Sequence, residues 1–485
     1  MVRLMKRMVS APFLLFLLAG LAFGLSISRV TQLPNRYFIV FLLSIALPFV
    51  AVLFGDIRRF LMVALIVSIP LRIDINFKRI FENQAGASSL GISLSDVFLI
   101  VLLFIWILEL ATREDVPRPR LYPRLTVPAL LFFEVSLLSL CWAPRLDLAT
   151  LEIVQMFKVL LLYFVFANHI RSRADLKLAL WALAGTLAAE SVLGLAQAAS
   201  GQTFSLGFLG EARNIAEEGK LFRVGGTLGH PNRLAMFIEF LLPLTMSLFL
   251  FERARARRIL AVVIFGAAFL ALILTGSRGG WIGFLASMVI YFAALIRRRT
   301  IRARVLIGPA LLTVLIVLSS AMSSDIINRR VRGEDYGSAM SRIPMIQIAL
   351  NLIEAHPVGG VGLNNYAVVM GEFDNTILGR RYKSIHRPVH NTYLLIAGET
   401  GILGLASFLL LVFSAAAVLL RAMRSDDALH YLFALALVCG FLAFFLHGLV
   451  DKHSPGGNPL FYLLLSLCAA LSDPSALRLK GETRC

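Results

Sequence analysis

The chain has 485 residues, of which 58% are hydrophobic and only 16% are charged, and its formal net charge is +18 at pH 7. Soluble globular proteins carry about 25% charged residues, so the composition excludes an ordinary soluble protein and predicts an integral membrane protein. A strong positive charge also occurs in nucleic-acid-binding proteins, but here the basic residues gather in loops between apolar runs. The four cysteines have neither the spacing of a zinc site nor that of a disulfide framework.

Apolar runs of helical length recur along the whole chain. A helix needs about 20 residues to cross a hydrocarbon core of about 30 Å. We predict membrane segments at residues 12–27, 37–53, 60–71, 94–111, 127–142, 153–167, 178–199, 234–251, 259–275, 280–296, 305–322, 401–420, 431–449 and 460–471. The segments at 60–71 and 460–471 are short enough to be partial or re-entrant. The pattern therefore predicts an all-α integral membrane protein, a polytopic bundle of about 12 to 14 transmembrane helices.

The basic residues predict the orientation of this bundle. Twenty-six of the 47 lie in clusters at residues 3–7, 58–59, 113–124, 171–177, 253–258, 297–304, 421–424 and 478–484. The positive-inside rule makes these loops cytoplasmic, and both termini then lie in the cytoplasm. The short segment 60–71 must cross the membrane if all later basic clusters are to lie on the cytoplasmic side. The first segment also resembles a signal peptide, but the many spans that follow favour an uncleaved anchor.

The predicted topology divides the chain into five parts. These are an N-terminal transmembrane bundle at 1–199, an external loop at 200–233, central helices at 234–322, a large external loop at 323–390, and C-terminal helices with a cytoplasmic tail at 391–485. The large loop is far longer than ordinary connections, which is typical of a functional loop. Within it, Ile343, Ile346, Ala349, Leu350 and Ile353 recur at helical spacing, and HPVGGVG follows. We predict an amphipathic helix on the outer membrane face, ended by this turn.

Many arginines and lysines lie on the external side, which the positive-inside rule depletes. They include Arg213, Lys220, Arg223, Arg233, Arg278, Arg329, Arg330, Arg332, Arg342, Arg380, Arg381, Lys383 and Arg387. One guanidinium group can bind two phosphate oxygens at once, so this set of residues is typical of a site for a lipid phosphate or diphosphate. The alternative is that they bind anionic headgroups or nearby carboxylates. Arg278 differs from the others, because it lies in the short turn TGSRGG between two predicted spans, where a charge is costly and usually functional.

His390 follows the basic segment and begins the stretch HNTYLLIAGETGILG. Cationic neighbours would favour a neutral imidazole that can accept a proton from a hydroxyl, so we interpret it as a general base. A capping role is the alternative, and a third is a zinc site with His386 and His356. Pro388 disfavours the helix that this zinc site needs. We assign Glu399, further along the same element, a buried structural role.

Two glycine-containing segments could present backbone amides to an anion. GTLGHPNRLA, residues 226–235, places Pro231 and Asn232 at a helix start. GGVGLNN is a weaker match, because no strand precedes it and no GK[ST] follows. The sequence contains neither a Walker motif nor an Asp-x-Asp pair, so we expect neither ATP nor a nucleotide sugar as the energy source.

Four motifs in chain order resemble the O-antigen ligase and O-antigen polymerase superfamily. They are GTLGHPNRLA, TGSRGGW at 275–281, the segment 341–366 that ends in HPVGGVGLNNY, and HNTYLLIAGETGILG at 390–404. The resemblance implies a bacterial inner-membrane glycosyltransferase with a GT-C-like fold. Such proteins transfer a glycan from undecaprenyl diphosphate to an acceptor sugar hydroxyl on the periplasmic side, without metal or cofactor and with inversion.

The resemblance also implies roles for individual residues. Arg278 and Arg342 would hold the diphosphate, and His390 would activate the acceptor. We add as candidate substrate-binding residues Arg223, His230, Asn232, Arg381, Lys383, Arg387 and Asn391. A ligase acting on lipid A core and a polymerase of lipid-linked units use the same donor chemistry, so both stay open, with the ligase preferred. A protein glycosyltransferase of the family and a transporter of lipid-linked glycan are further alternatives.

Overall fold

The computed structural model describes residues 55–79, 86–114, 116–204, 206–209, 211, 222–298, 342–376, 388–452 and 455–472. The predicted membrane segments at 12–27, 37–53 and 305–322 therefore lie outside the described residues. Each of the other eleven predicted segments corresponds to a helix. The division of the chain into five parts stays a prediction.

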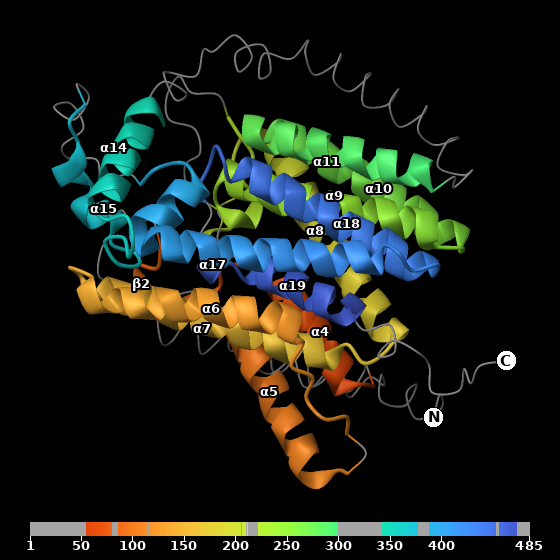
Figure 1. Ribbon diagram of the computed structural model, residues 1–485. Helices are drawn as coiled ribbons and strands as arrows, with labels where there is room; N and C mark the ends of the chain where they lie inside the picture. The colour runs from red at the N-terminus through yellow and green to blue at the C-terminus, as the bar shows by residue number, and fades with distance from the viewer. Residues whose placement is uncertain are drawn as a thin grey trace, which may run out of the picture.

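The described residues are mostly helical (Figure 1). The helices are α4 Ile57–Ser68, α5 Leu94–Thr112, α6 Pro123–Leu138, α7 Leu146–His169, α8 Arg173–Ser200, α9 Pro231–Phe251, α10 Arg255–Leu274, α11 Arg278–Arg297, α14 Arg342–Ala355, α15 Tyr366–Val369, α17 Thr392–Ala422, α18 Ala428–His447 and α19 Pro459–Ser472. The remaining elements are the short 3₁₀ turns η1 Ser139–Trp142, η2 Gly207–Leu209, η3 Gly226–Leu228, η4 Met370–Phe373 and η5 Pro455–Gly457, and the strands β1 Asp74–Arg79 and β2 Ser89–Ser93. Nine helices in the described part of the chain are long and apolar enough to cross a membrane, which confirms the polytopic all-α prediction.

Helices α9 and α18 form the centre of the bundle. Their apolar windows are 72% and 78% buried inside the protein, whereas that of α5 is only 28% buried. Helix α18 packs against α9, α11 and α17, and α17 lies along α6. Helix α5 leaves the layer of α6 and α7 at a steep angle (Figure 1). Because the central helices are covered on most sides by protein, polar residues on them face other helices rather than lipid.

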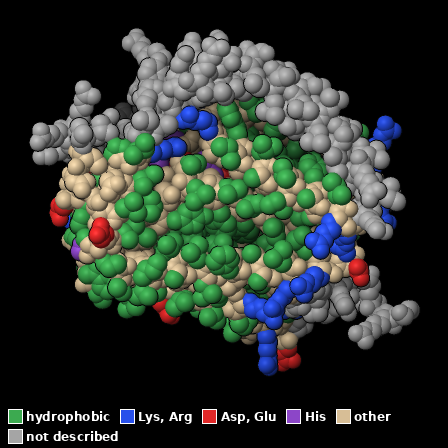
Figure 2. All heavy atoms as spheres, turned by 45° about the horizontal axis from the view of Figure 1, so that its top comes forward, with side chains coloured by type: hydrophobic (Ala, Val, Ile, Leu, Met, Phe, Trp, Pro, Cys, Tyr) green, Lys and Arg blue, Asp and Glu red, His purple; other side chains and the backbone are tan. Residues whose placement is uncertain are grey.

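Ion pairs show that the predicted cytoplasmic clusters at 58–59, 171–177 and 297–304 share one end of the bundle, which we call the basic end. The pairs join the N-terminal ends of α4 and α8, the C-terminal end of α5, the start of α18 and the end of α11: Arg58–Asp175, Arg171–Glu109, Arg173–Asp427 and Arg298–Asp426. Figure 2 shows an apolar surface across the molecule, with Lys and Arg side chains gathered beyond it at the right. The opposite end, where α9, α11 and α17 begin, is called the site end.

The short segment predicted at 60–71 runs from the basic end toward the site end. It forms α4, whose 12 residues extend about 18 Å. Arg58 pairs with Asp175 at its start, and the carbonyl of Pro70 accepts a bond from Thr227, which also binds Glu190. Asp175 and Glu190 lie on α8, about 22 Å apart along that helix. The 12-residue helix connects the basic end with η3 because the η3 turn at Thr227 lies inside the bundle, where it bonds the carbonyl of Pro70.

The strands β1 and β2 form an antiparallel hairpin between α4 and α5. Lys158, midway along α7, bonds the carbonyl of Gly91 on β2 and forms an ion pair with Asp96 at the start of α5. The hairpin therefore lies beside the middle of α7 and not beyond its end. Lys158 is the only lysine or arginine that we predict inside a span. The ion pair with Asp96 gives it the carboxylate partner that a charge at this depth requires.

Helix α14 confirms the helix predicted in the large loop, but of the predicted apolar stripe only Ala349 is buried. Ile348, Ala349 and Leu352 are buried, and α14 packs against α17. Ile343 and Leu350 are 61% and 47% exposed. The predicted stripe thus remains largely on the surface, where an apolar face can contact lipid.

Helix α17 begins nine residues before the predicted span 401–420 and contains a kink at Gly401, where φ is 67° and ψ is −170°. The HPVGGVG turn packs into this kink: the amides of Val361 and Gly362 donate to the carbonyls of Gly398 and Glu399, each at 2.9 Å. A Cβ at Gly401 would lie 2.0 Å from the carbonyl oxygen of Val358. Both the left-handed backbone and this close approach require glycine.

We therefore expect Gly401→Ala to lower the free energy of unfolding by at least about 2 kcal/mol, since it adds left-handed strain and a clash with backbone. The melting temperature of the purified protein in detergent would measure this. Gly266→Ala, in α10, is the matched control, because nothing lies within 4 Å of its added Cβ. Equal melting temperatures for the two variants would contradict the assigned role of the kink.

Candidate active site

Polar residues gather at the site end, where three long helices begin. Helices α9, α11 and α17 start at Pro231, Arg278 and Thr392, and the turn after α18 lies among them. Helix N-termini carry a partial positive charge and favour anions. Basic and histidine side chains lie together in a hollow near the top of Figure 2, next to the grey atoms.

His390 forms a pair with Asp451 at this end. Its Nδ1 lies 2.8 Å from Oδ1 of Asp451, and the two side chains are 30% and 8% exposed. Because a carboxylate accepts, Nδ1 carries the proton and Nε2 keeps a lone pair. The imidazole is oriented by a buried acid, and within the described ranges its other nitrogen has no hydrogen-bond partner, which suits a general base.

Asp451 is itself held from three sides. Its Oδ1 also accepts from the amide of Lys452 at 2.8 Å, and its Oδ2 accepts from Nδ2 of Asn232 on α9. Its backbone carbonyl accepts from the hydroxyl of Thr392 on α17 at 3.1 Å. These bonds explain how a carboxylate is kept buried and aimed at His390. The sequence analysis did not identify Asp451; its one signal is an acidic residue directly after the predicted span 431–449.

Arg223 and Asn232 connect this pair to the TGSRGG turn. Arg223 donates from Nη2 to Oδ1 of Asn232 at 2.8 Å and from Nε to the carbonyl of Thr275 at 2.6 Å. Both were predicted to bind substrate. In the structure, their hydrogen bonds join Thr275, the first residue of the turn, to Asp451.

The two arginines proposed for the diphosphate begin helices. Arg278 is the first residue of α11 and Arg342 the first of α14, and both are half-buried. Helix α14 packs against the start of α17, where Val389 and Leu395 join its buried cluster, so this helix lies at the same end of the bundle. The TGSRGG turn is placed by Ser277, whose Oγ accepts from the amide of Gly280 at the start of α11.

The remaining candidate residues mainly organise helix starts. Nδ1 of His230 accepts from the amide of Asn232 and caps α9. Oδ1 of Asn391 accepts from the amides of Tyr393 and Leu394 and caps α17, while its Nδ2 donates to the carbonyl of Leu449. Arg381, Lys383 and Arg387 lie outside the described residues. Their roles stay predictions.

The glycine segments use their backbone amides inside the protein. In GTLGHPNRLA, the amides of Gly226 and Thr227 donate to the side chains of Gln197 and Glu190, which are buried on α8. In GGVGLNN, the amide of Leu363 donates to the hydroxyl of Ser139 at 3.0 Å. These amides are therefore not available to an anion.

The zinc alternative gains no support from the described residues. His356 lies edge-on to Phe373, with ring centroids 5.8 Å apart, and His390 pairs with Asp451. His386 lies outside the described residues. Within the described ranges, no group of three or more histidine, cysteine, aspartate or glutamate residues is placed to hold a metal ion.

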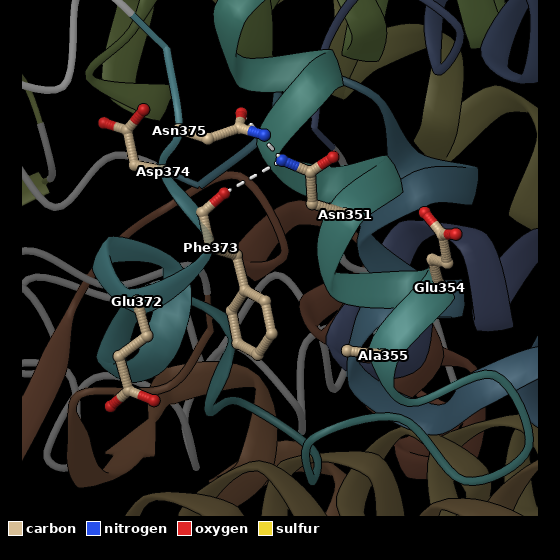
Figure 3. Close-up of a pocket in the computed structure, with 7 residues that line it drawn as sticks. All are labelled: Asn351, Glu354, Ala355, Glu372, Phe373, Asp374 and Asn375. Atoms are coloured by element: carbon tan, nitrogen blue, oxygen red, sulfur yellow. Dashed lines mark hydrogen bonds between the residues drawn. The ribbon is translucent and has the colours of Figure 1, made fainter.

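A cavity of about 400 Å³ lies between α14 and η4 (Figure 3). Its lining is Asn351, Glu354, Ala355, Glu372, Phe373, Asp374 and Asn375. The amide of Asn351 donates to the carbonyl of Phe373 and to Oδ1 of Asn375, which closes one side. The charged side chains of this lining are all carboxylates, which repel a diphosphate. The arginines at the site end carry the positive charge that the lining of this cavity lacks.

The fold and the site together define a multi-pass membrane protein with a buried acid–histidine pair at one end of its bundle. Residues 260–409 match a family model described as O-antigen ligase. This match confirms the resemblance to the O-antigen ligase and polymerase superfamily, and it supports a function of that general type. The matched residues include Arg278, Arg342 and His390 but not Asp451. No curated protein matches the sequence significantly.

Proposed function

We propose that the protein is an O-antigen ligase-type glycosyltransferase. It transfers a glycan from undecaprenyl diphosphate to a sugar hydroxyl of lipid A core, in the bacterial inner membrane and on its periplasmic face. The observation that carries this proposal is the His390–Asp451 pair at the helix starts that also carry Arg278. A base beside a phosphate-binding group is what transfer from a diphosphate donor needs.

His390 acts as the general base. With Nδ1 bonded to Asp451, its Nε2 accepts the proton of the acceptor hydroxyl as that oxygen attacks the anomeric carbon. The bond between this carbon and the diphosphate oxygen breaks, and the electron pair leaves with undecaprenyl diphosphate. Direct attack inverts the anomeric configuration. Asp451 stabilises the imidazolium that results, and this ion then releases its proton to water.

Arg278 and Arg342 stabilise the leaving diphosphate. Charge grows on its oxygens as the bond breaks, and guanidinium groups placed beforehand stabilise that charge at little cost in reorganisation. The start of α11 adds its partial positive charge at the same place. We assign Arg381, Lys383 and Arg387 to the same donor or to its glycan, and a GT-C-like membrane fold to the whole chain.

A polymerase that joins lipid-linked repeat units is the second candidate. The family match applies equally to it, and its donor chemistry is the same. The long external loop before the His-Asn pair favours the ligase. The two functions differ only in the acceptor.

The acceptor can be identified with purified protein in detergent and EDTA. Undecaprenyl diphosphate glycan is mixed either with lipid A core or with a second lipid-linked unit. Product on lipid A core identifies a ligase, and a ladder of longer lipid-linked glycans identifies a polymerase. Failure with both acceptors, while donor binding is intact, would overturn the proposed transfer and favour a transporter.

Arg278→Lys tests the diphosphate site. Lysine keeps the charge but lacks the planar fork, so we expect the KM for the donor to rise about 10- to 100-fold, the effect of losing one charge-assisted hydrogen bond. Arg421→Lys is the matched control, because Arg421 is an exposed arginine near the C-terminal end of α17, at the basic end. Equal donor KM in both variants would contradict the role of Arg278.

A further inference from the structure

Three buried polar residues, His447, Glu239 and Ser277, connect the TGSRGG turn to α18 and α9, and the proposed mechanism does not use them. Nδ1 of His447, the last residue of α18, lies 2.9 Å from Oε1 of Glu239 on α9. Its Nε2 lies 3.2 Å from Oγ of Ser277. The three residues are 1%, 0% and 4% exposed, respectively. Ionisable residues at such positions are costly and rarely kept without a function.

His447 also holds the other half of the site through its backbone. Its carbonyl accepts from the amides of Val450 and Asp451, each at 3.0 Å. The imidazole thus contacts the residue before Arg278, and the carbonyl positions the partner of His390. One residue therefore connects the proposed diphosphate-binding turn with the proposed base.

The start of α11 is fitted closely to this imidazole. A Cβ at Gly279 would lie 2.5 Å from Cδ2 of His447 and 2.7 Å from Cγ2 of Val450. A Cβ at Gly280 would lie 3.2 Å from Oε2 of Glu239, an oxygen without a hydrogen-bond partner among the described residues. The two glycines after Arg278 therefore let the turn rest on the His447–Glu239 pair.

We propose that His447 is a positioning residue that holds Arg278 in register with the His390–Asp451 pair, and that Glu239 orients its ring. Since Nδ1 donates to Glu239, Nε2 accepts the Ser277 hydroxyl and holds the turn. Apolar packing would fill the same space at no cost of desolvation, but it would not select one position of the turn. The proposal rests on the proposed function for its effect on catalysis, but the geometry of the turn can be tested without substrate.

Two amide variants separate the two contacts of the ring. Asparagine places its amide near the position of Nδ1, so His447→Asn keeps the bond to Glu239 and loses the bond to Ser277. Glutamine reaches the position of Nε2, so His447→Gln keeps the bond to Ser277 and leaves Glu239 without its donor. Leaving a buried polar side chain without its hydrogen-bond partner destabilises a protein. A purely structural role therefore predicts that His447→Gln is the more damaged variant in every measurement.

The positioning role predicts opposite rankings. His447→Gln has the lower melting temperature, whereas His447→Asn has faster hydrogen exchange at the amides of 276–281, by about tenfold, and about tenfold weaker binding of undecaprenyl diphosphate without glycan. In His447→Gln, the exchange rate of these amides and the affinity for undecaprenyl diphosphate stay within about threefold of wild type. The proposal is overturned if exchange and affinity follow the melting temperature, or if neither variant changes exchange in the turn.

The same experiment distinguishes this inference from the proposed function. Hydrogen exchange is measured on the full-length protein in detergent without any ligand, so it decides whether His447 holds the turn. If wild-type protein binds no undecaprenyl diphosphate, the proposed function fails, and the exchange ranking still supports or overturns the positioning role.

Discussion

Replacing His390 by alanine is expected to lower kcat for glycan transfer by a factor of about 10² to 10⁴, the usual contribution of a general base. The donor KM should change less than threefold, because the imidazole receives the acceptor proton and the arginines bind the diphosphate. The measurement is steady-state transfer by purified protein at saturating donor, with melting temperatures to verify folding.

The matched control is His356→Ala. His356 is likewise a histidine next to a helix end, but its ring packs on Phe373. We expect its kcat to stay within threefold of wild type. A His390→Ala variant that keeps more than a tenth of wild-type kcat would exclude the base mechanism and favour a transporter, which tolerates the loss of one proton acceptor.

Asp451→Asn should lower kcat about 10- to 100-fold, as is typical when the partner that orients a functional histidine is changed. Oδ1 of Asp451 faces Nδ1 of His390, and Oδ2 faces the amide nitrogen of Asn232. Both neighbours donate, but an asparagine can accept with only one of its two terminal atoms. Either the bond to Asn232 is lost, or the amide turns and forces His390 into the tautomer whose Nε2 carries the proton.

The double variant Asp451→Asn with Asn232→Asp separates orientation from charge. The new carboxylate at position 232 accepts from the new amide at position 451, which leaves the carbonyl oxygen of that amide to accept from His390. The same carboxylate keeps an oxygen to accept from Arg223, as the Asn232 side chain does in the wild type. If orientation of His390 dominates, we expect kcat of the double variant to be at least tenfold higher than that of Asp451→Asn. If the negative charge at position 451 dominates, we expect the two variants to have the same kcat. Wild-type activity in Asp451→Asn would contradict any role of the pair.

Several features of this protein follow from local sequence. Membrane helices are recognised because each must bury or expose a long apolar surface, and eleven predicted segments appear as helices. The clustering of arginine in alternate loops is also local, and the ion pairs of Arg58, Arg173 and Arg298 show that three of these clusters share one end. His390 and Arg278 stand out as polar residues beside long apolar runs. His390 was placed at a helix start, but the predicted span 401–420 omits the first nine residues of α17, because the kink at Gly401 depends on a turn from the large loop.

By itself, the sequence determined the class of protein, the helix positions and the residues with the strongest chemical signal. Only the tertiary structure decided which of them work together. Asp451 is 61 residues from His390, and Glu239 is 208 residues from His447, so no local pattern links them. They meet because α9, α17 and α18 pack side by side with their ends aligned, and a buried carboxylate at that junction must find a donor. The physical reason is the cost of leaving a buried polar group unpaired, which only the packed bundle can resolve.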